Sequence, residues 1–578
     1  MRILLTAINA KYIHSNLAVY TLKAYAEKYL ATYAPDKLGI DIAEYTINQQ
    51  TDDILRGIYK KAPDVLCLSC YIWNISYVEE IVKEIHKLLP NMDIWLGGPE
   101  VSYDAKEVLI RLPQVRGIMR GEGEKSFAGV CKIYMERNFE QLAETAGITY
   151  RQEDGQIKAN IHQELMELDE IPFVYEDMRD FEHKIIYYES SRGCPFSCSY
   201  CLSSIDKAVR FRSLSLVKPE LQLLLDYKVP QVKFVDRTFN LKHERTLEIW
   251  SYLAEHDNGI TNFHFEIAAD LLNQEELTLI QTMRPGLIKL EIGVQSTNPD
   301  TLKEIRRTAD FESIKKNVEF IKSSGNVHGH LDLIAGLPFE DIKSFARSFD
   351  EVYALRPNQL QLGFLKVLKG SYMEENRAAY GLIFKEEPPY EVLSTKWISY
   401  DDVLELKGVE EMVEVYYNSG QFSHTLEALS EESASPWKLY MELWKYYEGR
   451  HYHEGQHKRS ARYKILFEFI KKYIPERTEE FRELLTFDYY LRENAKTRPE
   501  FAGEYKVEKE FLRKFYEREE EERKYLPEYK EYDKNQMRKM THIENFTILR
   551  KMLLFDYKCR NPLNQEARTC MIKKELYI

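Results

Sequence analysis

Three closely spaced cysteines near the middle of the chain constrain its fold and chemistry more than any other feature. Residues 185–188 are β-branched or aromatic and predict a strand. The loop that follows carries Cys194, Cys198 and Cys201 at C-x3-C-x2-C spacing. Three thiolates on one loop can hold a [4Fe–4S] cluster and leave one iron open, whereas most clusters use four cysteines. Open coordination is typical of metal centres that carry out chemistry. The alternatives are a zinc knuckle, which lacks a fourth Cys or His at suitable spacing, and three idle thiols.

The chain is too long for a single hydrophobic core. Its 578 residues predict about two to four domains. Hydrophobic residues make up 44% and charged residues 30%, as in ordinary globular proteins. A net charge of −13 disfavours a general nucleic-acid-binding role.

The cysteine usage and the N-terminus bear on location. Eight cysteines with one clustered group do not form the framework of a secreted disulfide protein. The first residues lack the apolar run and cleavage site of a signal peptide. No apolar run approaches the ~18 residues that a membrane span requires. We therefore expect a cytoplasmic protein with no membrane span.

Short apolar strands alternate with helical stretches over residues 1–140. This alternation predicts a Rossmann-like, doubly wound parallel sheet, whose ligands bind outside the carboxyl ends of the strands. The strands are predicted at residues 2–7, 40–45, 64–70, 93–96 and 115–119.

The residues that follow these strands resemble those of the cobalamin-binding domains. Ser69 stands where that family has the serine of its S-x-L motif, with Tyr71 in place of the leucine, and Gly97-Gly98 match its pair of glycines. Glycine permits a close approach of the backbone to a ligand. The resemblance implies that the strand-end loops with Ser69, Gly97, Gly98, Gly121 and Glu122 contact cobalamin.

One part of the cobalamin-binding pattern is missing. The D-x-H-x-x-G motif, whose histidine ligates cobalt in the family, is absent, and His14 is the only histidine of the first loop. We expect His14 to cap or pack. The resemblance then implies cobalamin bound without a protein histidine. The alternative is a degenerate domain that binds no cofactor.

A second run of strands and helices occupies residues 182–380, after a polar connector at residues 141–181. The six predicted strands form a partial (β/α)6 TIM-type barrel, with the site at their carboxyl ends. They lie at residues 185–188, 231–236, 262–267, 287–293, 328–334 and 359–364.

Polar residues gather at the predicted carboxyl ends of these strands. Any one of them alone is more often a helix cap or an ion-pair partner, but their shared position at one rim favours a binding site. They are Asp236, Arg237, Glu266, Glu291, Gln295, Ser296 and Asp332.

This segment resembles the radical S-adenosylmethionine (SAM) enzymes. The cysteine loop matches the cluster motif of that family, and residues 291–296 look like its E-x-G-x-Q-S stretch, whose polar residues lie near the nucleoside of SAM. Phe196 stands where an aromatic ring lies near the adenine, and Asp236 follows the strand that carries Gly-Gly-Glu in the family. The resemblance implies Cys194, Cys198 and Cys201 as cluster ligands and the following residues as SAM contacts: Phe196, Asp236, Glu266, Glu291, Gln295 and Ser296.

The remaining residues, 381–578, form a charged, tyrosine-rich segment that we expect to be mainly helical. Residues 546–558 regain β-forming character and are expected to add a few strands. This part resembles a C-terminal extension of unknown role found on some cobalamin-binding radical SAM proteins. We expect its tyrosines and lysines either to line a substrate site over the barrel mouth or to form an ordinary helical core.

The leading hypothesis is a radical SAM enzyme with cobalamin as its second cofactor, and methyl transfer to an unactivated carbon is the first reaction that we consider for it. The family cleaves SAM to a 5′-deoxyadenosyl radical and takes electrons from a donor such as flavodoxin or ferredoxin. Ring formation, oxidation or rearrangement are alternatives within the class. A non-catalytic iron–sulfur electron-transfer protein is the alternative from another class. We expect a small-molecule or natural-product-like substrate and no nucleic-acid partner.

Overall fold

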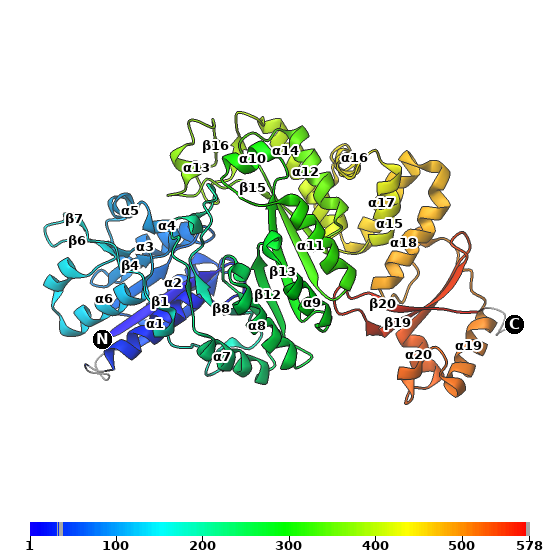
Figure 1. Ribbon diagram of the computed structural model, residues 1–578, viewed down its shortest axis with the longest axis horizontal. Coiled ribbons are helices and arrows are strands. Elements are labelled where there is room, and N and C mark those ends of the chain that lie inside the picture. Colours follow the sequence, from blue (N-terminus) through cyan, green and yellow to red (C-terminus); the bar gives the residue numbers. More distant parts are fainter. Residues whose placement is uncertain (32, 34–38, 574–578) are drawn as a thin grey trace.

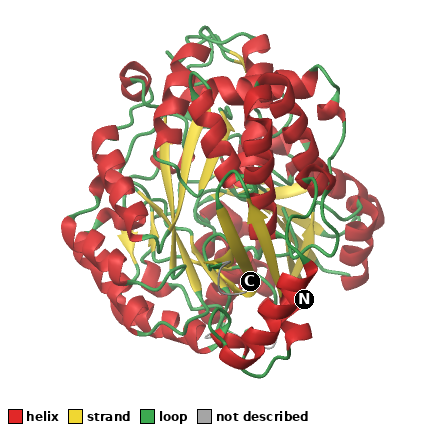
Figure 2. Cartoon of the chain, turned by 90° about the vertical axis from the view of Figure 1, so that its right-hand side faces the viewer, coloured by secondary structure: helices red, strands yellow, loops and turns green. Residues whose placement is uncertain are grey.

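A computed structural model describes residues 1–31, 33 and 39–573. Three parts follow one another along the longest axis of the molecule (Figure 1), so that the first strand, β1 (Arg2–Asn9), and the last, β20 (Ala567–Met571), lie far apart along it. Seen from the side, helices flank the strands over most of the surface (Figure 2). None of the helices in the described part of the chain has the length and apolar character needed to span a bilayer.

The first part is a sheet with strand order β2-β1-β3-β4-β5-β6-β7. Its first five strands are parallel. Two separate apolar clusters cover its faces, one from α1 and α6 and the other from α2, α3 and α5. The strands are β1 (Arg2–Asn9), β2 (Gly39–Thr46), β3 (Val65–Ser69), β4 (Asp93–Gly97) and β5 (Val115–Met119), and the helices α1 (Leu17–Leu30), α2 (Thr51–Lys61), α3 (Ile75–Leu88), α4 (Pro99–Ser102), α5 (Ala105–Arg111) and α6 (Glu124–Glu136).

A hairpin extends this sheet into the segment that the sequence analysis assigns to a connector. Strands β6 (Ile148–Arg151) and β7 (Ile157–Ala159) pair antiparallel with β5 and with each other. The chain therefore leaves the first sheet after β7. The rest of the connector, up to the second sheet, contains only short 3-10 turns.

The second part is the expected partial barrel of six parallel strands, which stand in space in the order of the sequence. Along β13, buried residues alternate with partly exposed ones, and the buried ones join the core under the helices. The strands are β8 (Ile186–Tyr188), β11 (Gln231–Phe234), β12 (Asn262–Ile267), β13 (Ile288–Gln295), β14 (His328–Ala335) and β15 (Gln359–Phe364). The helices are α7 (Leu214–Asp226), α8 (His243–Glu255), α9 (Gln274–Thr282), α10 (Pro299–Glu304), α11 (Phe311–Ser324) and α12 (Ile342–Ala354).

The third part is mainly helical, as expected, and ends in the antiparallel sheet β18-β19-β20. It packs against the edge strand β15 of the barrel, where the Asn418 side chain bonds to the backbone of Leu360. Its elements are α13 (Tyr372–Glu375), β16 (Ile383–Phe384), β17 (Val392–Ser394), α14 (Tyr400–Met412), a π-helical turn (Val413–Asn418), α15 (Ser423–Glu432), α16 (Pro436–Glu448), α17 (Arg459–Tyr473), α18 (Thr478–Arg492), α19 (Lys509–Glu522), α20 (Lys534–Met540), β18 (Thr541–Phe546), β19 (Lys551–Arg560) and β20 (Ala567–Met571).

Candidate functional site

The cysteine loop leaves the barrel after β8 and is fixed at both ends by backbone pairing. Short strands β9 (Ser191–Arg192) and β10 (Arg210–Phe211) pair antiparallel across it. Gly193 has φ of 95°, and a β-carbon there would lie 2.4 Å from the Ala208 carbonyl oxygen. Only glycine fits this close, left-handed turn, which aims the following cysteines.

Asp236 anchors the segment that leads into the loop. Its carboxylate is fully buried and accepts hydrogen bonds from the Ser190 amide (2.8 Å), the Ser190 hydroxyl (2.7 Å) and the Ser191 hydroxyl (2.5 Å). Burial raises the pKa of Asp236 to about 6 although these donors favour the charged form. Asp236 is not among the residues that line the cavity described below. Its contacts are those of a positioning residue.

The three predicted cluster ligands are free thiols on this one loop. Cys198 is buried, while Cys194 and Cys201 are partly exposed. Burial raises the pKa of the Cys194 thiol, and the neighbouring Cys201 and Cys198 raise it further, because negative charge on one sulfur atom would disfavour negative charge on the next. A cluster that draws on three thiolates fits this donor set, because bound iron would neutralise the charges that otherwise repel.

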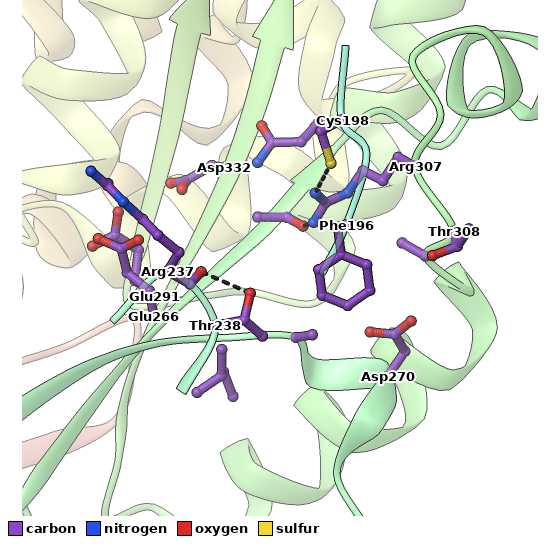
Figure 3. Close-up of a pocket in the computed structure, with 15 residues that line it drawn as sticks. Phe196, Cys198, Arg237, Thr238, Glu266, Asp270, Glu291, Arg307, Thr308 and Asp332 are labelled. Atoms are coloured by element: carbon purple, nitrogen blue, oxygen red, sulfur yellow. Dashed lines mark hydrogen bonds between the residues drawn. The ribbon is translucent and has the colours of Figure 1, made fainter. Parts of the chain in front are cut away.

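A cavity of about 160 Å³ opens beside the loop at the carboxyl ends of the barrel strands. Of the six predicted SAM contacts, Phe196, Glu266, Glu291 and Gln295 line it together with Cys198. The Phe196 ring lies beside the Cys198–Arg307 contact (Figure 3). Ser296 does not line it, because its buried hydroxyl donates to Glu340 (2.7 Å).

Several lining residues carry no signal in the sequence. Arg307 follows α10 in an irregular segment, yet its Nη1 lies 3.7 Å from Cys198 Sγ and 3.3 Å from the Tyr200 hydroxyl. Arg307 also donates to the Gly293 carbonyl. Thr238, Asp270 and Thr308 also belong to the polar lining, together with Arg237 and Asp332 of the predicted rim.

Buried polar atoms at the cavity lack a hydrogen-bond partner among the described residues. They include Gln295 Oε1 and Arg307 Nε. Buried polar groups are nearly always hydrogen-bonded in folded proteins. An acceptor and a donor are therefore left available to a polar ligand such as SAM.

Carboxylates with different pKa values form the barrel side of the cavity. Burial raises the pKa of Glu266 to about 6. Burial also acts to raise that of Glu291, but His264 at 2.9 Å and the charge of Lys233 lower it to about 2. Glu291, His330 and Asp332 present ligand atoms within 4.8 Å of one another. Because Lys233 and His264 already contact Glu291, we interpret this group as an ion-paired network rather than a metal centre.

The predicted cobalamin residues lie together along the carboxyl edge of the first sheet. Ser69 of β3 pairs with Gly97 of β4, and Gly97 pairs with the end of β5, just before Gly121. A β-carbon on Gly98 would lie 2.4 Å from the Cys70 carbonyl oxygen, whereas one on Gly121 would meet nothing within 4 Å. The edge of the sheet thus carries small residues, and the space beside Gly121 is open. A large flat cofactor requires such space.

Contacts between side chains bring this edge against the cysteine loop. Glu122 forms ion pairs with Arg210 (2.5 Å) and Arg192 (3.5 Å), and these arginines lower its pKa against the opposing effect of burial. Glu124 also pairs with Arg192 (2.8 Å). His14 packs with its Nδ1 2.6 Å from the Tyr187 hydroxyl of the barrel. The strand-end loops of the first sheet therefore face the barrel.

Comparisons with known families match three consecutive segments of the chain. Residues 5–131 match the B12 binding domain, residues 188–352 the Radical SAM superfamily, and residues 378–561 a protein family of unknown function, DUF4080.

Two curated relatives and one solved structure illustrate the similarity. The chain is 26% identical over 306 residues to the 2-(S-pantetheinyl)-carbapenam-3-carboxylate methyltransferase of Streptantibioticus cattleyicolor, covering 49% of this chain and 44% of the relative. It is 24% identical over 323 residues to the anaerobic magnesium-protoporphyrin IX monomethyl ester cyclase of Rubrivivax gelatinosus, covering 53% and 56%.

The structure of the cobalamin-dependent SAM radical enzyme OxsB with aqua-cobalamin and SAM bound has a TM-score of 0.57 at 17% identity. The match covers 84% of this chain and 78% of that one, and shows the shared fold. The chain thus carries, in this order, a segment that matches the B12 binding domain and a segment that matches the Radical SAM superfamily.

Proposed function

We propose that this protein is a radical SAM enzyme that uses a [4Fe–4S] cluster, SAM and cobalamin to methylate an unactivated carbon of a small molecule. One observation carries the proposal: the cavity lined by Cys198, Glu291 and Gln295 adjoins the three-cysteine loop, while the glycine-rich edge of the first sheet faces the same loop. Three cofactor sites are thus arranged around one space.

The roles of the residues follow from their positions. When bound, the cluster and SAM supply a reactive carbon radical and cobalamin supplies a methyl donor; the protein supplies binding, orientation and exclusion of water. Cys194, Cys198 and Cys201 hold the cluster. Phe196 and Gln295 orient SAM, which leaves Arg307 to hold Cys198 and the backbone of Gly293 in place.

The cobalamin site is proposed at Ser69, Gly97, Gly98 and Gly121. Glu122 belongs to it only as a positioning residue, because its carboxylate is already held by Arg210 and Arg192. Asp236 and Ser296 likewise act by holding neighbouring backbone and side chains rather than by touching SAM. The one-electron donor is proposed to be a flavodoxin or a ferredoxin.

A second candidate, ring formation or another rearrangement without methyl transfer, has support from one observation. The matched relatives include the magnesium-protoporphyrin cyclase as well as the carbapenam methyltransferase. Both candidates use the same three cofactor sites. They differ in whether a methyl group that originates from SAM is transferred to the product.

The first test is anaerobic reconstitution with iron, sulfide and a reductant. We expect release of 5′-deoxyadenosine from SAM, and its absence in protein with an intact cluster would overturn the radical SAM proposal. Cys198→Ala should lose the cluster iron, and Cys570→Ala, at a partly exposed cysteine of β20, should keep it.

The second test separates the cofactors and the two candidate reactions. Protein incubated with hydroxocobalamin and desalted should keep the visible spectrum of a bound corrinoid. A visible spectrum without corrinoid bands would indicate a first domain that binds no cofactor. Methyl-deuterated SAM then distinguishes the reactions, because only methyl transfer places deuterium in a product.

A further inference from the structure

The inside of the barrel carries a row of basic side chains below the cavity. In β13, Lys289 shares its face with Glu291 and Gly293, which line the cavity, while the alternate residues are buried under the helices. Register pairs Lys289 with His264 on one side and His328 on the other, and His264 with Lys233. Lys233, His264, Lys289 and His328 are called the basic row.

Such a row is unusual because the interiors of complete barrels are filled by bulky apolar side chains. The next row toward the cavity contains Glu266, Glu291 and His330, paired in the same register. Its charged members keep contact with water, with side chains 29% exposed at Glu266 and 23% at Glu291. The polar side chains of this row therefore stand between the cavity and the basic row.

Within the basic row, Lys289 has no ion-pair partner in the described part of the chain, although the charges of Glu291 and Asp332 act on it from a greater distance. Lys233 lies 3.3 Å from Glu291 and 3.8 Å from Glu266. In the described part of the chain no carboxylate lies within ion-pair distance of Lys289 Nζ. Burial lowers the pKa of Lys289. Next to it, His328 Nδ1 is buried without a hydrogen-bond partner among the described residues. A partly buried cation favours an anionic ligand, and His328 can donate a hydrogen bond to one in the tautomer that carries its proton on Nδ1.

We propose that the substrate carries a carboxylate or phosphate group that binds Lys289 and His328, with the reacting carbon held at the cavity. Four residues separate Lys289 from Gly293 along β13, which places the two ends of the substrate about 13 Å apart at the usual rise of a strand. The inference names the substrate class of the proposed enzyme and therefore rests on the proposed function.

The test measures protection of Lys289 by simple anions in the reconstituted full-length protein. Trinitrobenzenesulfonate modifies unprotonated amines, and peptide mass spectrometry reports the rate at each lysine. Inorganic phosphate, malonate and chloride are compared at equal ionic strength. We expect phosphate or malonate to slow labelling of Lys289 at least threefold relative to chloride, with Lys316, exposed on α11, unchanged.

Protection by phosphate alone assigns a phosphorylated substrate, and protection by malonate alone assigns a carboxylate. Equal labelling of Lys289 in all three salts overturns the proposal. Calorimetric titration with the protecting anion gives an independent readout: Lys289→Met should lose the heat of binding, and Lys316→Met and Lys289→Arg should keep it.

These outcomes are separable from failure of the proposed function. Release of 5′-deoxyadenosine without protection of Lys289 overturns the substrate inference alone. Absence of 5′-deoxyadenosine in cluster-loaded protein overturns the function on which it rests.

Discussion

The side-chain amide of Gln295 fills the space beside residue 293, where a β-carbon would lie 2.2 Å from Gln295 Nε2. Gln295 itself has φ of 71°, and β13 pairs with β14 through a register shift at this point. The glycine two residues earlier thus allows the glutamine to fold back along the strand while its Oε1 stays without a partner at the cavity. The E-x-G-x-Q pattern has a steric cause here.

Gly293→Ala should therefore weaken SAM binding more than it weakens the fold. The new methyl group meets the end of a flexible side chain, which can move away, so we expect a loss of stability of no more than about 1 kcal/mol. The Gln295 amide leaves its position, and we expect the Kd for SAM to rise about tenfold, equivalent to about 1.4 kcal/mol.

Equilibrium dialysis with SAM and a thermal unfolding scan check this pair of effects. Gln295→Ala is the matched variant and should raise the Kd by a similar factor. A wild-type Kd in the Gly293→Ala protein would show that the glutamine does not contact SAM.

Gly98→Ala should impair cobalamin retention and spare the cluster. Gly98 has φ of 115° and its β-carbon would lie 2.4 Å from the Cys70 carbonyl oxygen, so the backbone itself must move. Gly155→Ala is the matched control, because Gly155 also has positive φ (84°) but nothing within 4 Å. Visible spectra after desalting should show corrinoid in the control and little in Gly98→Ala, with equal iron contents. Equal corrinoid in both proteins would count against the glycine edge as the cofactor site.

The regular parts of this fold are predictable from local pattern. Along β13 an apolar residue alternates with a polar one, and this period of two sets both the strand and the side facing the interior. The cysteine spacing and the small residues after β3 and β4 are likewise local patterns that can be recognised without the structure. For this reason the barrel strands and the loop of Cys194, Cys198 and Cys201 follow from the sequence.

The rest depends on contacts between distant segments. Arg307 lies in an irregular segment 109 residues after Cys198, and no local pattern relates the two. Asp236 looks like a rim residue, but burial against Ser190 and Ser191 turns it into an anchor. Strand β6 is buried in the core of the first sheet through Ile148 and Tyr150, and its pairing with β5 is a contact that no local pattern in the connector reveals.

Asp236 should make stability depend on pH in the direction opposite to an ordinary ion-paired carboxylate. Its pKa is raised from 3.8 to about 6 in the folded protein, so the folded state binds the proton more tightly than the unfolded state. The resulting stabilisation, at most about 3 kcal/mol at 1.36 kcal/mol per pKa unit, is present below pH ~4 and lost as the pH rises through ~6.

The measurement is the difference in melting temperature between wild type and Asp236→Asn from pH 5 to pH 8. Asparagine does not titrate, so the melting temperature of the wild type should fall relative to that of the variant as the pH rises. A difference that stays constant, or grows in favour of the wild type, would contradict the raised pKa.

Arg307→Lys should reduce turnover of SAM without removing the cluster. Lysine keeps the positive charge but cannot contact Cys198, Tyr200 and the Gly293 carbonyl at once, as the guanidinium does. We expect 5′-deoxyadenosine formation to fall about tenfold, or about 1.4 kcal/mol, at an unchanged iron content. Arg306→Lys is the neighbouring control, because Arg306 stacks on Tyr372 (3.8 Å to the ring centre) instead. An equal loss of 5′-deoxyadenosine formation in both variants would show that the effect comes from a general disturbance of this segment and not from the contacts of Arg307.

Asn418 should prove necessary for joining the third part of the chain to the barrel. Its Oδ1 accepts from the Leu360 amide and its Nδ2 donates to the Leu360 carbonyl, both at 2.9 Å, so one side chain satisfies the exposed edge of β15 as a neighbouring strand would. An open strand edge invites pairing with other chains.

Asn418→Ala leaves both groups unpaired, and Asn418→Asp restores the acceptor while placing a negative charge against the Leu360 carbonyl. We expect the free energy of unfolding of each variant to fall by about 1–3 kcal/mol and hydrogen exchange at the Leu360 amide to become faster. Asn358→Ala is the control, because Asn358 Oδ1 accepts instead from the Gly329 amide of β14 (2.8 Å). This control should leave the Leu360 amide protected. Unchanged exchange at Leu360 in Asn418→Ala would show that the helical part covers this edge by other contacts.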